Sequence, residues 1–342
     1  MKTIIRAFAL LLLLSPLAGA AQEKKKYKVL ALTQSKGFRH GPVTRKSPQD
    51  LCLSEVTITQ IGKDSGLFDT ECTQDANTIT AEKLKDVDLL LFYTTGGDLL
   101  SPATWTAIDE WLKSGKAFVG THSSTDTMNN HKGYYEMING TFSGHPWGSG
   151  ETVTMTNHDP NHVTVKMLGP EFQWKDEIYQ YSHYDPKAVR VLYSLNMAKC
   201  KTRMPYHVPV CWVREYGSGR LFYTNLGHNE STWTNAKFKD HLLAGIRWAL
   251  KLEEGSATPN PEVQALENTK SMVAALVAST GKKEDEIAAL VDKVAAADPA
   301  SRARLTDDLQ GYRKEEADLQ SRFKKEQAEL QKKLVKLLSE LK

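Results

Sequence analysis

Residues 87–120 read VDLLLFYTTGGDLLSPATWTAIDEWLKSGKAFVG, and this stretch decides the fold class. Val87 to Tyr93 and Ala117 to Gly120 are short apolar runs typical of strands. Pro102 to Lys113 between them predicts a helix, because Ser101 can cap it and proline suits the first helical position. A strand, a helix and a strand in this order favour two parallel strands joined by a covering helix.

The same alternation extends in both directions. Tyr27 to Leu32 predicts the first strand, and the segment around Leu67 to Cys72 lies between it and the next one. Phe238 to Leu252 is apolar at helical spacing and predicts a closing helix. The later part is richer in strands, with antiparallel hairpins expected among Glu151 to Thr156, Val189 to Leu195, Val210 to Tyr216 and Arg220 to Asn225. We predict one α/β domain over residues 27–252, with a mostly parallel sheet and helices on both faces.

The composition changes after this domain. Residues 253–261 indicate a linker, and residues 262–342 are rich in Ala, Leu, Glu, Lys and Gln, which predicts a helical extension. Apolar residues at 4-3 spacing between Ser301 and Lys342 favour a helical hairpin or a coiled coil with a stutter. Packing on neighbouring helices and self-association of the chain through this extension are both open.

Residues 1–21 have the pattern of a secretory signal peptide. A basic start, an apolar run from Ala7 to Leu17 and the small residues Ala18-Gly19-Ala20 follow one another. The apolar run is shorter than the roughly 20 residues of a membrane span. We therefore expect cleavage, a periplasmic or secreted protein, and no membrane span after cleavage. A formal net charge of +3 gives no sign of a nucleic-acid partner.

Four cysteines in an exported chain permit disulfides. Cys52 with Cys72 and Cys200 with Cys211 are the expected pairs, because each pair is close in sequence. Buried free thiols that act as small apolar residues are the alternative.

Histidines follow three of the expected strands. His40 comes after the first strand, His122 after the strand ending at Gly120, and His228 after the strand ending at Asn225. Open α/β sheets bind ligands at the carboxyl ends of their strands, so these side chains are expected in one pocket, which His145 and His183 can join. A single histidine is usually structural, so the prediction rests on the set.

The same residues belong to five motifs that occur in order and cover nearly all of residues 27–252. They are Phe38-Arg39-His40, Gly120-Thr121-His122-Ser123-Ser124-Thr125-Asp126, Phe142-Ser143-Gly144-His145-Pro146, Asp176-Glu177-Ile178-Tyr179, and Pro209-Val210-Cys211-Trp212 through Gly217-Ser218-Gly219-Arg220 to Leu226-Gly227-His228. Together they resemble the trehalose-utilisation, or ThuA-like, family. The resemblance implies a flavodoxin-like sheet of the class I glutamine amidotransferase-like superfamily, a role in carbohydrate metabolism and a small-molecule carbohydrate as partner.

The turn at Gly120 to Ser123 departs from the amidotransferases. Those enzymes carry a nucleophilic cysteine there, and this chain has Gly-Thr-His-Ser. Glutamine hydrolysis through a thioester is therefore excluded, because it needs a thiolate at this turn. The resemblance points to His122 and Asp126 as catalytic residues rather than to Ser123 or Ser124 as a nucleophile.

Two versions of one chemistry follow from this set, and the resemblance implies an oxidised sugar as the substrate. In the first, His122, His40 and His228, with Asp126 to orient His122 or share an ion, move protons on an oxidised sugar. A keto group acidifies the adjacent C–H, a histidine removes that proton and the glycosidic substituent leaves. In the second, two or three of His40, His122, His145 and His228 hold a divalent metal cofactor that polarises the substrate.

The remaining candidates are assigned to substrate binding. One acidic residue of the pair Asp176 and Glu177 is expected at the pocket, with Glu177 chosen. Trp147 and Trp233 are flanked by small polar residues and are expected to be exposed for stacking on a sugar, with core packing as the alternative. The full set is Arg39, His145, Trp147, Glu177, His183 and Trp233.

Two functions of different classes remain open at this point. The first is an exported hydrolase, lyase or isomerase that acts on a carbohydrate, favoured by the titratable residues at strand ends. The second is a non-catalytic sugar-binding or envelope-associated module, favoured by the helical extension.

Overall fold

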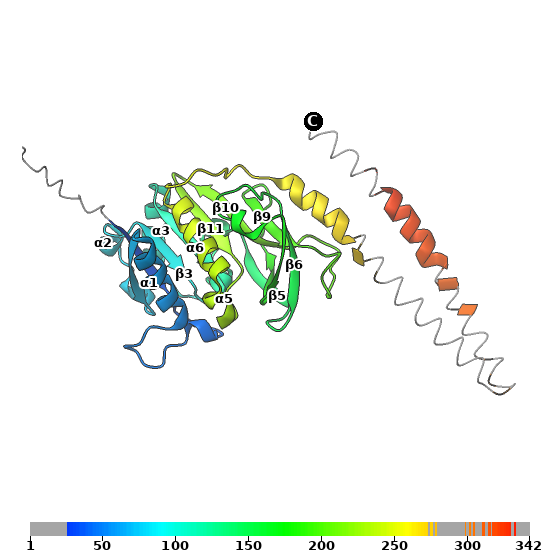
Figure 1. The fold of residues 1–342 in the computed structure, drawn as a ribbon, viewed down its shortest axis with the longest axis horizontal. Helices are drawn as coiled ribbons and strands as arrows, with labels where there is room; N and C mark the ends of the chain where they lie inside the picture. Colours follow the sequence, from blue (N-terminus) through cyan, green and yellow to red (C-terminus); the bar gives the residue numbers. More distant parts are fainter. Residues whose placement is uncertain are drawn as a thin grey trace, which may run out of the picture.

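The structure, a computed structural model, describes residues 26–272 and, beyond them, 274–275, 278, 298, 301, 304, 310–311, 314–315, 317–329 and 332 (Figure 1). The expected signal peptide, residues 1–21, and much of the expected coiled coil lie outside the described residues. Within the described part of the chain, no helix is long and apolar enough to cross a membrane.

The main sheet has nine strands in the order β2-β1-β3-β4-β11-β10-β9-β6-β7. Its first five strands pair in parallel: β2 Phe68–Thr73, β1 Tyr27–Leu32, β3 Leu89–Phe92, β4 Ala117–Thr121 and β11 Gly219–Thr224. The other four are antiparallel to their neighbours: β10 Pro209–Tyr216, β9 Arg190–Leu195, β6 Thr152–Asn157 and β7 Glu171–Lys175.

The sheet is therefore mixed, and the parallel arrangement describes one half of it. The change occurs at the hairpin of β10 and β11, whose turn Gly217-Ser218 is too short for the crossover that parallel strands need. Gly217 has a φ of 60°, in the left-handed region that such tight hairpin turns require. The expected turn at Gly217 to Gly219 is confirmed.

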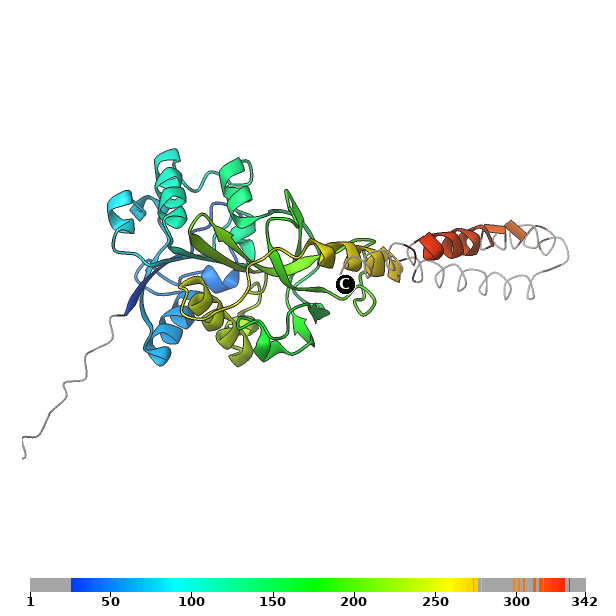
Figure 2. The same cartoon turned by 90° about the horizontal axis from the view of Figure 1, so that it is seen from above.

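Helices cover both faces of the sheet (Figure 2). One face carries α1 (Leu53–Ser65), α5 (Glu230–Thr234) and α6 (Ala236–Ala249), and the other carries α2 (Ala81–Leu84), α3 (Pro102–Lys113) and α4 (Lys132–Ile138). Alternate residues of β1 supply the two cores. Val29 and Ala31 pack in one hydrophobic cluster, and Leu30 and Leu32 pack in the other.

The helix predicted after Ser101 forms as expected. The Ser101 hydroxyl accepts a hydrogen bond from the Thr104 amide at 3.1 Å, and Pro102 occupies the first turn. Trp105, Ile108 and Leu112 face the core.

A two-stranded antiparallel ribbon was not expected from the sequence. It pairs β5 (Thr141–Trp147) with β8 (Ile178–Ser182), and its register is interrupted at Phe142/Gly144 and at Gly144/Trp147. The α/β domain also contains four short 3-10 segments: η1 Gly41–Val43, η2 Ala76–Thr78, η3 His122–Thr125 and η4 Lys166–Leu168.

The expected disulfides are wrong, because all four cysteines are free. Cys52 Sγ lies 3.4 Å from Ser54 Oγ at the start of α1, whereas Cys72 Sγ lies 3.9 Å from Thr59 Oγ1. The other expected pair is likewise separated, since the Cys200 thiol bonds to a carbonyl of β6 and Cys211 is buried in β10. Three of the thiols, those of Cys52, Cys200 and Cys211, are buried, as the alternative expectation states.

The segment after α6 is attached to the domain. Asn260 is buried, and its side chain bonds to both backbone polar groups of Val191 in β9, at 2.7 and 3.0 Å. Residues 261–272 then form a helix, drawn in yellow in Figure 1. Its Asn268 side chain accepts a hydrogen bond from the His207 backbone amide at 2.6 Å. The start of the helical extension thus contacts the α/β domain.

Candidate functional site

Three histidines from three strand ends meet at one edge of the parallel half. His40 lies in the loop after β1, His122 directly follows β4, and His228 lies in the loop after β11. The ring centroids of these histidines are 4.8 to 5.2 Å apart. His40 and His122 are buried, and His228 is partly exposed. The strands that carry them lie close together in the sheet, which explains why their loops converge.

His122 occupies a constrained position at the turn after β4. Its φ is 41°, a left-handed value that residues other than glycine seldom adopt. Tyr223 holds the turn by donating its hydroxyl hydrogen to the His122 carbonyl at 2.8 Å. His122 Nδ1 lies 2.8 Å from the Asn225 carbonyl oxygen, which can only accept, so this nitrogen carries the hydrogen. In the neutral ring, the Nε2 lone pair of His122 therefore faces the other histidines.

Glu177 joins the three histidines from the antiparallel half of the molecule. It lies between β7 and β8, and its Oε2 is 3.0 Å from His228 Nδ1 and 3.5 Å from His122 Nε2. Its other oxygen, Oε1, lies 3.3 Å from Nδ1 of His145 in β5. Burial raises the pKa of Glu177, but hydrogen bonds and charge from His122 and His228 outweigh it and hold the pKa well below its usual range. Glu177 is therefore an ionised carboxylate that touches three imidazoles.

Asp176, the neighbour of Glu177, has a different task. Its buried carboxylate accepts hydrogen bonds from the Gly227 amide at 2.8 Å, the Asn229 amide at 2.9 Å and the Thr232 hydroxyl at 2.8 Å. These three groups flank His228 in the chain, so Asp176 fixes the loop that presents His228. Asp176 is a positioning residue.

His40 is held as a neutral ring. Burial, followed by the charges of His122 and His228, lowers its pKa to about 2. Its Nε2 lies 3.5 Å from the Tyr179 hydroxyl, and the Tyr179 ring packs against His122 with centroids 4.4 Å apart. A neutral imidazole keeps a lone pair that can bind a metal or accept a proton.

The four groups fit a divalent metal ion. His40, His122, Glu177 and His228 each offer one ligand atom, and these atoms all lie within 4.8 Å of one another. Three of the separations, 3.0, 3.3 and 3.5 Å, are close to the edge of a tetrahedron with bonds of about 2.05 Å, which is roughly 3.3 Å. Nitrogen and carboxylate ligands suit zinc-like divalent metals. The hydrogen bond from His122 Nδ1 to Asn225 is the kind of outer contact that orients a metal-binding histidine.

Two expected catalytic or binding residues lie outside this set. Asp126 accepts a hydrogen bond from the Asn129 side chain at 2.8 Å, and the His122 nitrogen that Asp126 was expected to orient is bonded to Asn225 instead. His183 is exposed and stacks on Tyr135 with centroids 4.2 Å apart.

The expected exposure of the two tryptophans is wrong. Trp147 and Trp233 are both fully buried. The Trp147 indole donates to the Thr202 carbonyl at 2.9 Å, while Trp233 donates to the Gly227 carbonyl at 2.8 Å and stacks on Tyr93. Their polar neighbours in sequence do not decide exposure, because tertiary contacts bury both rings.

The rim of the site carries exposed groups instead. His145 has a side chain that is 53% exposed, and Arg39 is exposed next to His40. Phe38, which the sequence reasoning did not select, is 66% exposed and lies over His228 in a stacked arrangement at 6.4 Å. The signal was available, because Phe38 is two residues from His40 in a loop that follows a strand. An exposed aromatic ring beside polar groups is suited to stack on a sugar.

Comparisons with known proteins agree with this architecture. The family model described as trehalose utilisation, ThuA, matches residues 28–249. A ThuA-like protein from Parabacteroides merdae has 18% identity and a TM-score of 0.55, over 69% of this chain and 94% of that one. A ThuA-like protein from Bacteroides uniformis has 20% identity and a TM-score of 0.53, over 69% and 94% of the two chains. A comparison with curated proteins finds no match.

Proposed function

The chain belongs to the trehalose-utilisation family, and from this premise we propose that it is an exported enzyme that acts on keto derivatives of glycosides at a metal-assisted histidine–carboxylate centre. One observation carries the proposal. His40, His122, Glu177 and His228 bring one ligand atom each to a common point, although they come from four separate segments of the chain. A purely structural role for one of these residues would not require the ligand atoms of all four to lie close together.

Each group has a definite part in the proposal. His40, His122, His228 and Glu177 would hold a divalent metal, which as a Lewis acid would polarise a ketone or hydroxyl oxygen of the sugar. His145 is the base, because its side chain is half exposed and its Nδ1 contacts Glu177 Oε1, which orients the ring. Phe38 offers its exposed ring to the apolar face of the sugar.

The proposed reaction is an elimination. His145 takes the proton from the carbon between the ketone and the anomeric carbon. The electron pair of that C–H bond forms a carbon–carbon double bond to the anomeric carbon. The bond from the anomeric carbon to the glycosidic oxygen breaks, its electron pair leaves on that oxygen, and the oxygen gains a proton from the protonated His145 or from water. Addition of water to the double bond would complete a net hydrolysis.

Metal analysis tests the centre. The protein is purified, analysed for divalent metals by mass spectrometry, stripped with a chelator and assayed for cleavage of a 3-keto-glycoside before and after metal is restored. We expect bound metal close to one per chain and activity that depends on it. Full turnover by metal-free protein would leave only the acid–base version of the proposal.

A His122→Ala variant distinguishes the proposed enzymatic function from the alternative, a non-catalytic sugar-binding module. We expect it to lose turnover, because His122 combines a fixed ring with a lone pair aimed at the centre. Retained turnover would contradict the assignment. Binding of the keto-glycoside by the parent protein without any turnover would support the module, which the contacts of residues 261–272 with the domain favour.

The wider assignments belong to the same proposal. The strand order β2-β1-β3-β4-β11 supports a flavodoxin-like relationship to the class I glutamine amidotransferase-like superfamily. Residues 1–21 support export, and the apolar repeat within residues 301–342 supports self-association. The mass of the secreted chain and its sedimentation behaviour test these two points.

A further inference from the structure

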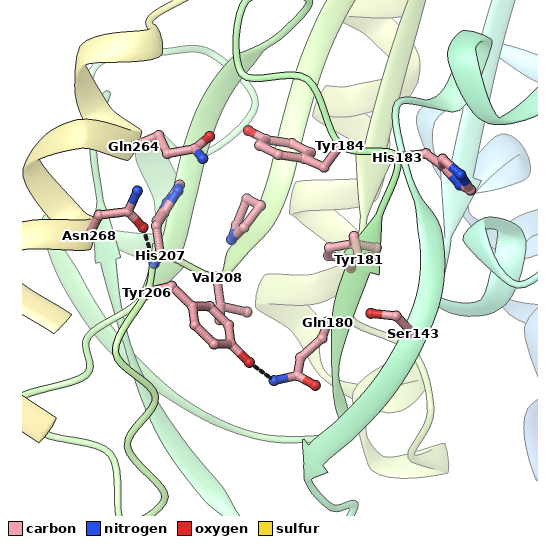
Figure 3. Close-up of a pocket in the computed structure, with 11 residues that line it drawn as sticks. Ser143, Gln180, Tyr181, His183, Tyr184, Tyr206, His207, Val208, Gln264 and Asn268 are labelled. Atoms are coloured by element: carbon pink, nitrogen blue, oxygen red, sulfur yellow. Dashed lines mark hydrogen bonds between the residues drawn. The ribbon is translucent and has the colours of Figure 1, made fainter. Parts of the chain in front are cut away.

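A second pocket of about 400 Å³ lies where the β5–β8 ribbon and the start of β10 meet the helix over residues 261–272 (Figure 3). Gln264 and Asn268 reach it from that helix, and Tyr206 and His207 reach it from the loop before β10. Its volume is in the range of small-molecule sites. The residues around it include none of His40, His122, Glu177 and His228.

Several buried polar atoms of the residues that line this pocket find no hydrogen-bond partner among the described residues. Both ring nitrogens of His207 are in this state, although the residue is only 7% exposed. The Tyr184 hydroxyl and Gln264 Oε1 are also buried without a partner. In Figure 3 these last two groups point toward one another across the pocket. Buried polar groups are nearly always satisfied, so this cluster indicates a ligand that carries hydroxyl groups.

The pocket is uncharged. The residues that line it in the described chain include no Asp, Glu, Lys or Arg. Burial, followed by the nearby His158, lowers the pKa of His207 to about 3, so His207 offers one donor and one acceptor as a neutral ring. A charged ligand would lack a counter-charge here, and a neutral one would not need it.

Aromatic rings and amides surround the same space. Tyr181, Tyr184 and Tyr206 line it with their rings, and the Gln180 amide donates to the Tyr206 hydroxyl. Aromatic faces beside paired donors and acceptors match the alternating C–H and hydroxyl groups of a pyranose.

We infer that this pocket binds one neutral saccharide unit, separately from the histidine–carboxylate centre, and that the first helix of the C-terminal extension completes it. The two sites are lined by different residues of the β5–β8 ribbon. Tyr179 of β8 contacts His122 and His40, whereas the next residue, Gln180, lines the pocket. The inference does not depend on the proposed metal chemistry, because the two sites share no residue.

Calorimetric titration of the full chain with D-glucose and with trehalose tests this. We expect saturable binding in the wild type, and binding about tenfold weaker in His207→Leu and in Gln264→Leu, because each removes a polar group offered to the ligand. Glu177→Gln is titrated in parallel and should bind the sugar with unchanged affinity. Tighter binding of trehalose than of glucose would indicate that the pocket holds one unit of a longer glycan. Equal affinity would indicate a site for a free monosaccharide.

Thermal unfolding shows whether a loss of sugar binding in a variant results from loss of the fold. His207→Leu replaces an unpaired buried ring with an apolar side chain, so its melting temperature should not fall. Gln264→Leu lies on the helix and provides a second, independent variant. Absence of saturable binding to either sugar at millimolar concentration would overturn the inference. Binding that is lost in Glu177→Gln and unchanged in His207→Leu would also overturn it, since the sugar would then occupy the histidine centre.

Discussion

Two groups of histidines in this molecule differ in the partners of their ring nitrogens. The first group lies around the carboxylate of Glu177 and consists of His40, His122, His145 and His228. Three of these rings contact the carboxylate, and His40 packs against two of them. The second group is His158, His162 and His241. Its nitrogens bond to the Ser194 hydroxyl, the Thr164 hydroxyl, and the Thr164 carbonyl with the Tyr193 hydroxyl, respectively.

The difference shows that burial alone does not make a histidine a candidate for catalysis or metal binding. In the second group each ring has neutral partners, and burial lowers the pKa of His158 and of His241 to about 4. These rings are neutral hydrogen-bonding parts of the core. In the first group, one buried carboxylate draws several rings to a common point. Glu177 is thus the residue that turns a packed cluster into a candidate reaction centre.

Removal of that carboxylate should have the largest effect. In Glu177→Gln, we expect kcat/KM for a keto-glycoside to fall about 10³-fold and metal content to fall with it, because the amide neither charges the centre nor orients His145 as a base. Steady-state kinetics and metal analysis measure this.

The matched control for that change is Glu55→Gln. Glu55 is also buried, but its carboxylate pairs with Arg45 at 2.6 Å rather than with a histidine. We expect this variant to lose about 3 kcal/mol of stability and to keep its metal. If Glu177→Gln also lost stability and kept its metal, Glu177 would be a structural carboxylate, and the proposed difference between the two groups of histidines would be wrong.

The second group should contribute to the acid sensitivity of the fold. His158 and His241 have folded-state pKa values of about 4, below the ordinary value of 6.5. Between about pH 6.5 and pH 4, the unfolded chain therefore binds more protons than the folded chain. Stability is full above pH 6.5 and falls by a few kcal/mol as the pH drops toward 4.

Urea unfolding across that pH window, in the wild type and in His241→Leu, measures this loss. The variant should show a smaller pH slope, since one of the titrating rings is gone. An unchanged slope in His241→Leu would show that this ring contributes nothing to the acid sensitivity.

Asp176→Asn should have an intermediate effect on the first group. An amide can accept at only one of the two oxygen positions through which the Asp176 carboxylate now binds Gly227, Asn229 and Thr232, so the loop that carries His228 would lose part of its anchor. We expect metal affinity to fall about 10- to 100-fold, as for other outer contacts of metal sites. Metal titration with a competing chelator measures it. Unchanged affinity would mean that the His228 loop is held by other contacts.

Phe38→Ala should have the smallest effect. The loss of an exposed ring beside His40 and His228 should raise KM about tenfold and leave kcat nearly unchanged, because stacking binds ground state and transition state alike. Phe38→Tyr should restore the wild-type KM. A fall in kcat in the alanine variant, with KM unchanged, would mean that the ring acts on the chemistry and not on binding.

Local patterns in the sequence were enough for the parallel half. The apolar runs of β1, β3 and β4 and the capped helix α3 depend on neighbours within a few residues, and the strand-end histidines follow from the same pattern. The antiparallel half was predicted less completely. The β5–β8 ribbon has an interrupted register, so a simple period of two does not reveal which of its residues face the centre.

The candidate site likewise combines residues that local sequence predicts with residues whose roles depend on tertiary structure. His40, His122 and His228 could be placed from strand ends, and Glu177 was chosen over Asp176 for the pocket. The contacts of Glu177 with three histidines, and the separate role of Asp176 in fixing the His228 loop, required a structure. Trp147 and Phe38 show the limit of local reasoning about exposure. Small polar neighbours did not expose Trp147, which other segments cover, and Phe38 is exposed at 66% in a loop beside the site.

The assembly of the centre from both halves of the sheet also affects how the chain matures. His122 and His228 are 106 residues apart in sequence, and Glu177 lies between them, so the loops that join these groups must close before they can meet. A partly synthesised chain that ends before Glu177 carries two of the four groups and no complete binding site. Metal capture is therefore expected late in folding, after the two halves have docked, and a bound ion would then stabilise the docked state by mass action.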